Sequence, residues 1–154
     1  PLSADHTEKC TFEKFRSNYL DECNPPLYPF GYGLSYSQFN YSDLSVSNAK
    51  PAGDTSIEAT VTLTNSGKYD GAEVVQLYIR DLVGSITRPV KELKGFQKVY
   101  LKAGESKKVT FKISPEDLKF YNSQLKFDWE AGDFDVMIGT NSHDVKTTRI
   151  SWTK

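Results

Sequence analysis

From residue 55 onward, apolar and polar residues alternate in one segment after another, and this alternation constrains the fold more than any other feature. In segment 55–64, Ile57, Ala59, Val61 and Leu63 share one parity, and polar residues take the other. Successive side chains of a β-strand point to opposite faces, so the pattern predicts a strand that is buried on one side only. The inward positions of the later strands follow the same rule: Val75, Leu77, Ile79, Val109, Phe111, Ile113, Phe134, Val136, Ile138, Thr148, Ile150 and Trp152.

Turn signals separate these segments. Ala103-Gly104-Glu105 predicts a tight hairpin, and segment 141–144 predicts the loop of the last one. Ser114-Pro115 resembles a helix N-cap followed by proline at the first helical position, which predicts one helical turn. The first strand changes parity between Tyr41 and Leu44, so we expect a bulge near Asp43. About seven main strands at short spacing predict an all-β, two-sheet antiparallel sandwich.

Composition and charge narrow the function classes. The chain has 154 residues, of which 38% are apolar and 25% charged, which is typical of a globular domain. The net charge of −1 argues against nucleic acid or an anionic membrane as the main partner. Residue 1 is proline and the only methionine is Met137, so we expect a fragment of a longer chain, with any targeting signal upstream.

The run 27–36 has neither the helical nor the strand periodicity of apolar residues, and it is rich in aromatic residues. Tyrosine combines an apolar ring with a polar hydroxyl that can stay in contact with water, and glycine permits close approach of the backbone. Both residue types suit a segment that packs against another protein surface. We expect Tyr28, Phe30, Tyr32 and Tyr36 to be candidate interdomain docking residues. We therefore divide the chain into an irregular arm, residues 1–37, and a β-sandwich domain, residues 38–154.

No catalytic, cofactor-binding or metal-ligating set emerges from the sequence. His6 and His143 are far apart, and His143 lies in a predicted hairpin tip, where a solvated role is expected. Asp128 and Glu130 flank Trp129, and we interpret them as carboxylates that point to solvent while Trp129 packs in the core. Segment 88–93 is predicted to be a structured crossing loop whose charges pair locally or across an interface. Cys10 and Cys23, the only cysteines, fit either a disulfide or two free thiols.

An ordered set of motifs runs along the chain: Pro29-Phe30-Gly31-Tyr32-Gly33-Leu34-Ser35-Tyr36, Val61-Thr62-Leu63-Thr64-Asn65-Ser66-Gly67, Glu73-Val74-Val75-Gln76-Leu77-Tyr78, Arg88-Pro89-Val90-Lys91-Glu92-Leu93-Lys94-Gly95-Phe96, Ala103-Gly104-Glu105-Ser106 and Ala131-Gly132-Asp133-Phe134-Asp135-Val136-Met137-Ile138-Gly139. Together these motifs resemble the C-terminal fibronectin type III-like domain, with its preceding linker, of glycoside hydrolase family 3 enzymes. The resemblance covers roughly residues 16–153, and the arm looks most like the periplasmic β-glucosidase branch.

The resemblance implies a fibronectin type III or immunoglobulin-like sandwich in a periplasmic or secreted parent enzyme that hydrolyses β-glucosidic bonds. The family's aspartate nucleophile and glutamate acid/base belong to domains that are absent here, so no catalytic residue carries over, and the chain is expected to be inactive alone. Its expected partners are the catalytic domains of the parent. Where many family members carry tyrosine after the Gly-acid turn, this chain has Phe134, so packing must hold that turn.

Two other function classes stay open. A carbohydrate-binding module would use exposed aromatic residues, and Tyr69, Tyr100, Tyr121 and Trp129 are its candidate contributors, through what would be weak contacts. An adhesion-type interaction domain fits the fold alone, and fold does not determine function.

Overall fold

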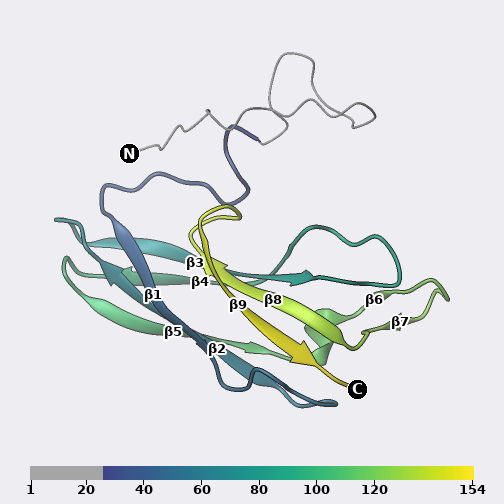
Figure 1. Ribbon diagram of the computed structural model, residues 1–154. Helices are drawn as coiled ribbons and strands as arrows, with labels where there is room; N and C mark the ends of the chain where they lie inside the picture. Colours follow the sequence, from purple (N-terminus) through teal and green to yellow (C-terminus); the bar gives the residue numbers. More distant parts are fainter. Residues whose placement is uncertain (1–25) are drawn as a thin grey trace.

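The computed structural model describes residues 26–154, which fold into two antiparallel β-sheets stacked face to face (Figure 1). One sheet has the strand order β1-β2-β5 and the other β4-β3-β8-β9. The strands are β1 Phe39–Val46, β2 Ile57–Asn65, β3 Gly71–Asp81, β4 Glu92–Leu101, β5 Ser106–Ile113, β6 Phe120–Tyr121, β7 Phe127–Asp128, β8 Gly132–Gly139 and β9 Val145–Trp152. The seven-stranded sandwich predicted from the sequence is confirmed, and β6 and β7 add a small separate hairpin.

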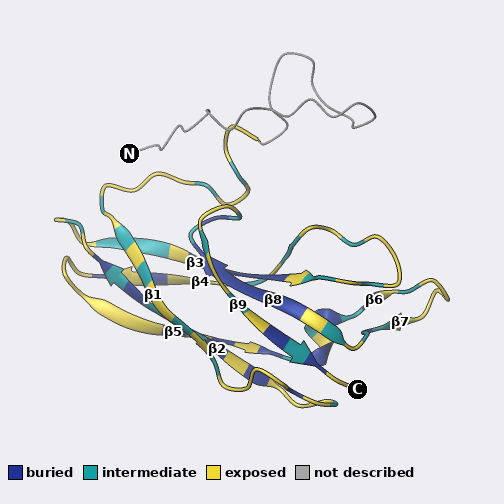
Figure 2. Ribbon diagram, viewed as in Figure 1, coloured by how far each residue is buried: buried dark blue, intermediate teal, exposed yellow. Residues whose placement is uncertain are grey.

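The core lies between the two sheets and is made by the residues that the alternation assigned to it. In β2, Ala59, Val61 and Leu63 have no exposed surface, and the residues between them face outward. Figure 2 shows this alternation as buried and exposed bands along the strands. Trp129 and Trp152 close one end of the core, with their ring centres 6.1 Å apart. Phe134 is also buried there, as packing at that turn requires.

Three local predictions are confirmed. The register between β1 and β2 shifts between Ser42 and Ser45, and Asp43 adopts a positive φ of 53°, which is the expected bulge. The 3-10 helix η1 Pro115–Leu118 begins after Ser114, whose backbone N–H donates to the Asp117 carboxylate at 2.8 Å. Residues 140–144 form the loop of the β8–β9 hairpin.

The predicted hairpin at Ala103-Gly104-Glu105 is wrong in its pairing, although the turn itself exists. Gly104 has a φ of 80°, and the N–H of Glu105 donates to the carbonyl of Lys102 at 3.0 Å. The strands on either side do not pair with each other, because β4 pairs with β3 and β5 pairs with β2. Each strand has one apolar face, and sending the two strands to opposite sheets buries both faces in the same core.

Within residues 26–154, no helix has the length and apolar character that crossing a membrane would require.

Candidate functional site

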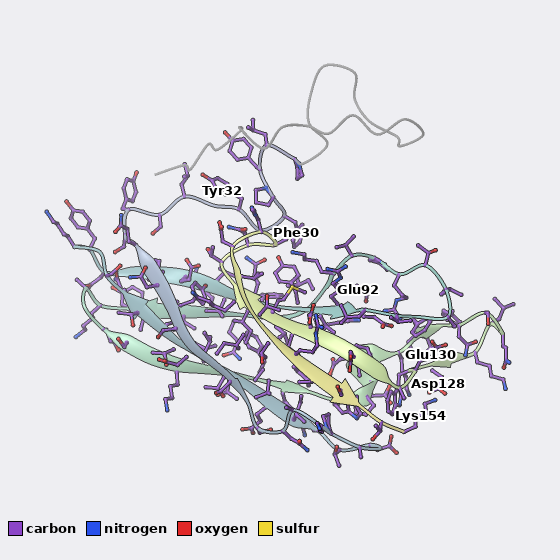
Figure 3. All side chains as sticks on the ribbon, viewed as in Figure 1. Phe30, Tyr32, Glu92, Asp128, Glu130 and Lys154 are labelled. Atoms are coloured by element: carbon purple, nitrogen blue, oxygen red, sulfur yellow. The ribbon has the colours of Figure 1, made fainter. Side chains whose placement is uncertain are left out.

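Residues 27–36, which we call the seam, are attached to the sandwich through their backbone. The carbonyl of Phe30 accepts a hydrogen bond from the N–H of Ser142, at the tip of the β8–β9 hairpin, at 2.8 Å. A turn closes when the N–H of Tyr32 donates to the carbonyl of Pro29 at 3.0 Å. Figure 3 shows Phe30 beside the hairpin tip. Anchoring by main-chain bonds leaves the side chains of the seam free to face elsewhere.

The seam lies on a buried glutamine of the four-stranded sheet. Gly31 has a φ of 80°, and a Cβ built on it would stand 2.2 Å from Oε1 of Gln76. Nε2 of Gln76 donates to the carbonyl of Thr140 and lies 3.4 Å from that of Gly31, and its Oε1 accepts the hydroxyl of Tyr78. Burial raises the pKa of Tyr78. The seam therefore covers part of the outer face of β3.

Most of the predicted docking side chains point away from the sandwich. Tyr28, Phe30 and Tyr36 are 59%, 66% and 97% exposed, whereas Tyr32 is half-buried and lies against Tyr28, with ring centres 5.1 Å apart. Large apolar side chains that gather on the surface of a soluble protein often mark an interaction site. The structure thus brings Tyr28 and Tyr32 together and leaves Tyr36 fully on the surface.

A polar network built on Asn65 holds the end of the seam. Asn65 is fully buried at the end of β2. Its Nδ2 donates to the carbonyls of Tyr69 at 2.8 Å and Leu101 at 3.2 Å, and its Oδ1 accepts the N–H of Gly67 at 3.0 Å. The hydroxyl of Ser37, just after the seam, lies 2.6 Å from the same oxygen. One side chain therefore joins both sheets to the segment that leads into β1.

The carboxylates on either side of Trp129 form ion pairs and hydrogen bonds at the surface, as the sequence indicated. Trp129 is only 4% exposed and packs in the core. Asp128 pairs with Lys154 at 2.6 Å, and the hydrogen bonds from Lys154 and from the backbone N–H of Trp129 lower the pKa of Asp128. The hydroxyl and the N–H of Ser85 both bond to Glu130 and lower its pKa. Both groups are held ionised by protein partners, and Figure 3 shows them at the end of the sandwich that also holds Lys154.

The charges of the loop before β4 pair locally, which is one of the two arrangements expected. Glu92 accepts from Arg88 at 2.7 Å and from Lys94 at 2.6 Å. Burial alone would raise the pKa of Glu92, but the hydrogen bonds from Lys94 and Arg88 outweigh it, and the pKa is lowered. The Arg88 guanidinium also stacks over the Phe120 ring, 4.0 Å from its centre. This cluster fixes the loop between β3 and β4.

Metal-binding and sugar-binding sites find little support among the described residues. No group of three or more histidine, cysteine or acidic side chains in residues 26–154 is placed to hold a metal ion. His143 is exposed in its hairpin loop, whereas His6, Cys10 and Cys23 lie outside the described residues. Of the candidate sugar contacts, Tyr69, Tyr100 and Tyr121 are exposed, but Trp129 is in the core, so its candidacy as a sugar contact was wrong.

Sequence reasoning missed the two residues that hold the seam, Gln76 and Asn65. Gln76 interrupts the apolar face shared by Val74 and Tyr78, and that interruption is the one signal that could have marked a covered position. Asn65 stands directly before Ser66-Gly67, which is a local turn sequence. Its bonds reach as far as Leu101, and a partner 36 residues away leaves no local pattern.

Comparison with known proteins finds similarity over nearly all of the chain. The family model for a fibronectin type III-like domain matches residues 73–142. The chain is 52% identical to a periplasmic β-glucosidase of Salmonella typhimurium over 86% of its length, and 53% identical to a putative β-xylosidase of Formosa agariphila over 87%. These matches cover only 17% and 18% of the two relatives.

Solved structures agree with the sequence relatives. A β-glucosidase from Listeria innocua in complex with isofagomine superposes with a TM-score of 0.85 at 43% identity, over 96% of this chain and 20% of that one. A Bifidobacterium adolescentis β-glucosidase of glycoside hydrolase family 3 superposes with a TM-score of 0.73 at 38% identity, over 81% of this chain and 18% of that one. The chain thus spans about a fifth of the length of the proteins that it matches.

Proposed function

The chain belongs to the fibronectin type III-like domains of glycoside hydrolase family 3 enzymes of the β-glucosidase type, and from that membership we propose that it is a non-catalytic accessory domain. The proposed parent hydrolyses β-glucosidic bonds of oligosaccharides. Its catalytic residues lie in the part of the enzyme outside this chain. Because the similar proteins include both β-glucosidases and a putative β-xylosidase, the proposal covers the class of β-glycosidic bond and not one sugar.

The observation that carries this proposal is the seam, which is held by its backbone and displays its aromatic side chains. Residues 1–37 are proposed to act as the linker and residues 38–154 as the accessory domain. We propose that Tyr28, Phe30, Tyr32 and Tyr36 dock on the catalytic domains of the parent. Burying the exposed two-thirds of a phenylalanine such as Phe30 removes roughly 130 Å² of apolar surface from water, which stabilises a docked state by about 3 kcal/mol.

The cellular location of the parent is proposed from the same similarity to known proteins. One similar protein is a periplasmic β-glucosidase, and the arm resembles that branch in sequence. We propose that the parent works in the periplasm or is secreted.

Hydrolysis assays test the absence of catalysis. The purified chain is expected to release no product from an aryl β-glucoside, while the Listeria innocua β-glucosidase serves as the positive control in the same buffer. The proposal would be overturned if the chain released product above the buffer blank and the variant Asp128→Ala abolished that release. A matched variant, Glu116→Ala, controls for general effects of removing a surface carboxylate, since the Glu116 side chain is 72% exposed.

Docking is tested in a chimera that carries this chain in place of the matching fifth of the Listeria innocua enzyme. Phe30→Ser is expected to lower the thermal midpoint of the chimera and to leave that of the isolated chain unchanged, because the ring is exposed in the isolated chain. Tyr121→Ser is the control, since Tyr121 is similarly exposed but lies on the β6–β7 hairpin, which Figure 1 shows projecting from the sandwich away from the seam. Equal effects of the two variants in the chimera would contradict docking through the seam.

A further inference from the structure

The outer faces of the two sheets differ in chemistry, although both belong to the same sandwich. On the three-stranded sheet, the outward residues of β2 and β5 are polar or charged, and hydroxyls pair across the strands: Thr60 with Thr110 at 2.9 Å, and Thr64 with Ser106 at 2.7 Å. Such a face is what a sheet exposed to water requires. It serves as an internal reference for the other face.

The outer face of the four-stranded sheet carries large apolar side chains instead. Register places Phe96 opposite Gln76 and Leu93 opposite Tyr78, and the side chains of both partners point outward. Val74 on β3 and Tyr100 on β4 share this face by parity, Tyr100 lying opposite Ala72 and Lys98 opposite Val74. Phe96 and Tyr100 are 67% and 62% exposed, and Val74 and Leu93 are about 40% exposed. We call these four residues the sheet patch.

The sheet patch is continuous with the seam. Phe96 is paired directly with Gln76, and the backbone of Gly31 rests on Gln76. The seam therefore covers one part of this face, and the sheet patch begins where the cover ends. Together with Tyr28 and Phe30, the four residues expose on the order of 700 Å² of side-chain surface, and the exposed Lys98 lies between Phe96 and Tyr100.

We propose that the sheet patch is the second half of the docking surface, and that its occupant is the catalytic part of the same polypeptide that the seam contacts. This inference rests on the proposed function. Two observations favour that occupant over a second copy of this chain. The patch adjoins the seam, through which the polypeptide enters the sandwich, and the matched proteins are about five times longer than this chain. Docking thus uses a rigid sheet face as well as a loop.

Hydroxyl-radical footprinting of aromatic side chains tests the sheet patch in the chimera described above. The oxidation rates of Phe96 and Tyr100 are expected to fall roughly fivefold from the isolated chain to the chimera, in proportion to the exposed area that docking removes. The rate at Phe30 is expected to fall as well, and the rate at Tyr121 to stay the same. The variant Phe96→Ser is expected to lower the thermal midpoint of the chimera and not that of the isolated chain.

The outcomes separate this inference from the proposal on which it rests. Protection of Phe30 without protection of Phe96 and Tyr100 would overturn the sheet patch and leave the seam as the whole docking surface. Protection of none of the three would overturn docking altogether. If the isolated chain dimerises by light scattering, and Phe96→Ser abolishes the dimer, the patch is an interface between copies and the inference is wrong.

Discussion

Replacing Gly31 by alanine tests how firmly the seam is seated on the sandwich. The φ of 80° at Gly31 costs an L-residue about 1–2 kcal/mol. The added Cβ would also displace the Gln76 side chain, which bonds to Thr140 and Tyr78, and each lost bond costs about 1 kcal/mol. Alanine also lowers the conformational entropy of the unfolded chain, which offsets about 0.5 kcal/mol of this loss of stability. We expect Gly31→Ala to lower the free energy of unfolding by about 2.5–3.5 kcal/mol.

The alternative response is that the seam detaches while the sandwich stays folded. Urea unfolding followed by the fluorescence of Trp129 and Trp152 reports on the core, because both rings are buried there. Hydrogen exchange at Ser142 reports on the seam, because its N–H donates to the carbonyl of Phe30. If the seam detaches, exchange at Ser142 is expected to accelerate about a hundredfold, while the urea midpoint changes little.

Gly33→Ala is the matched control, two residues away in the same seam. A Cβ there meets no atom within 4 Å, and Gly33 has no positive φ. Its expected effect on the free energy of unfolding is within about 0.5 kcal/mol. If Gly31→Ala and Gly33→Ala give the same urea midpoint and the same exchange rate at Ser142, the seam does not rest on Gln76 and the reasoning fails.

Two further predictions concern stability. Asn65→Ala removes a buried amide with partners in both sheets, so urea titration is expected to show that the free energy of unfolding falls by about 3 kcal/mol. The control Asn40→Ala changes an exposed residue and is expected to have almost no effect. Similar losses in the two variants would refute the network around Asn65. The pKa of Glu92 is lowered on folding, so its stabilisation is present above about pH 4.3, the ordinary pKa of a glutamate, and is lost as pH falls through the lower folded-state value. Glu92→Gln is therefore expected to flatten the acid side of a plot of unfolding free energy against pH. An unaltered slope in Glu92→Gln would contradict this.

Alternation along each strand made the core residues predictable from the sequence alone. The side-chain period of a strand is a local property, and one buried face selects the same residues whatever the partner strand is. The bulge at Asp43 and the turn at Ser114 were predictable for the same reason, since a parity slip and a capping residue are written within a few positions. The aromatic content of the seam likewise marked it as a contact segment, although docking itself remains a prediction.

Pairing between strands was not predictable from the same signals. The turn at Gly104 has the local chemistry of a hairpin, yet it joins strands of opposite sheets. Local turn chemistry sets the reversal of the chain, and burial of two apolar faces in one core decides where each strand pairs. The difference between the two outer faces was also not predictable, because only strand pairing places Phe96 opposite Gln76 on the outer face.

The amino-acid sequence was sufficient to predict which strand residues form the core between the sheets, that the chain forms a two-sheet sandwich, and which family it resembles. The place where the seam rests, the side chains that it displays and the sheet face that stays apolar follow only from the tertiary fold. The cause is separation along the chain: Gly31 meets Gln76 across 45 residues, and Asn65 meets Leu101 across 36. Contacts at that range arise when packed sheets bring the segments together, and no local period in the sequence records them.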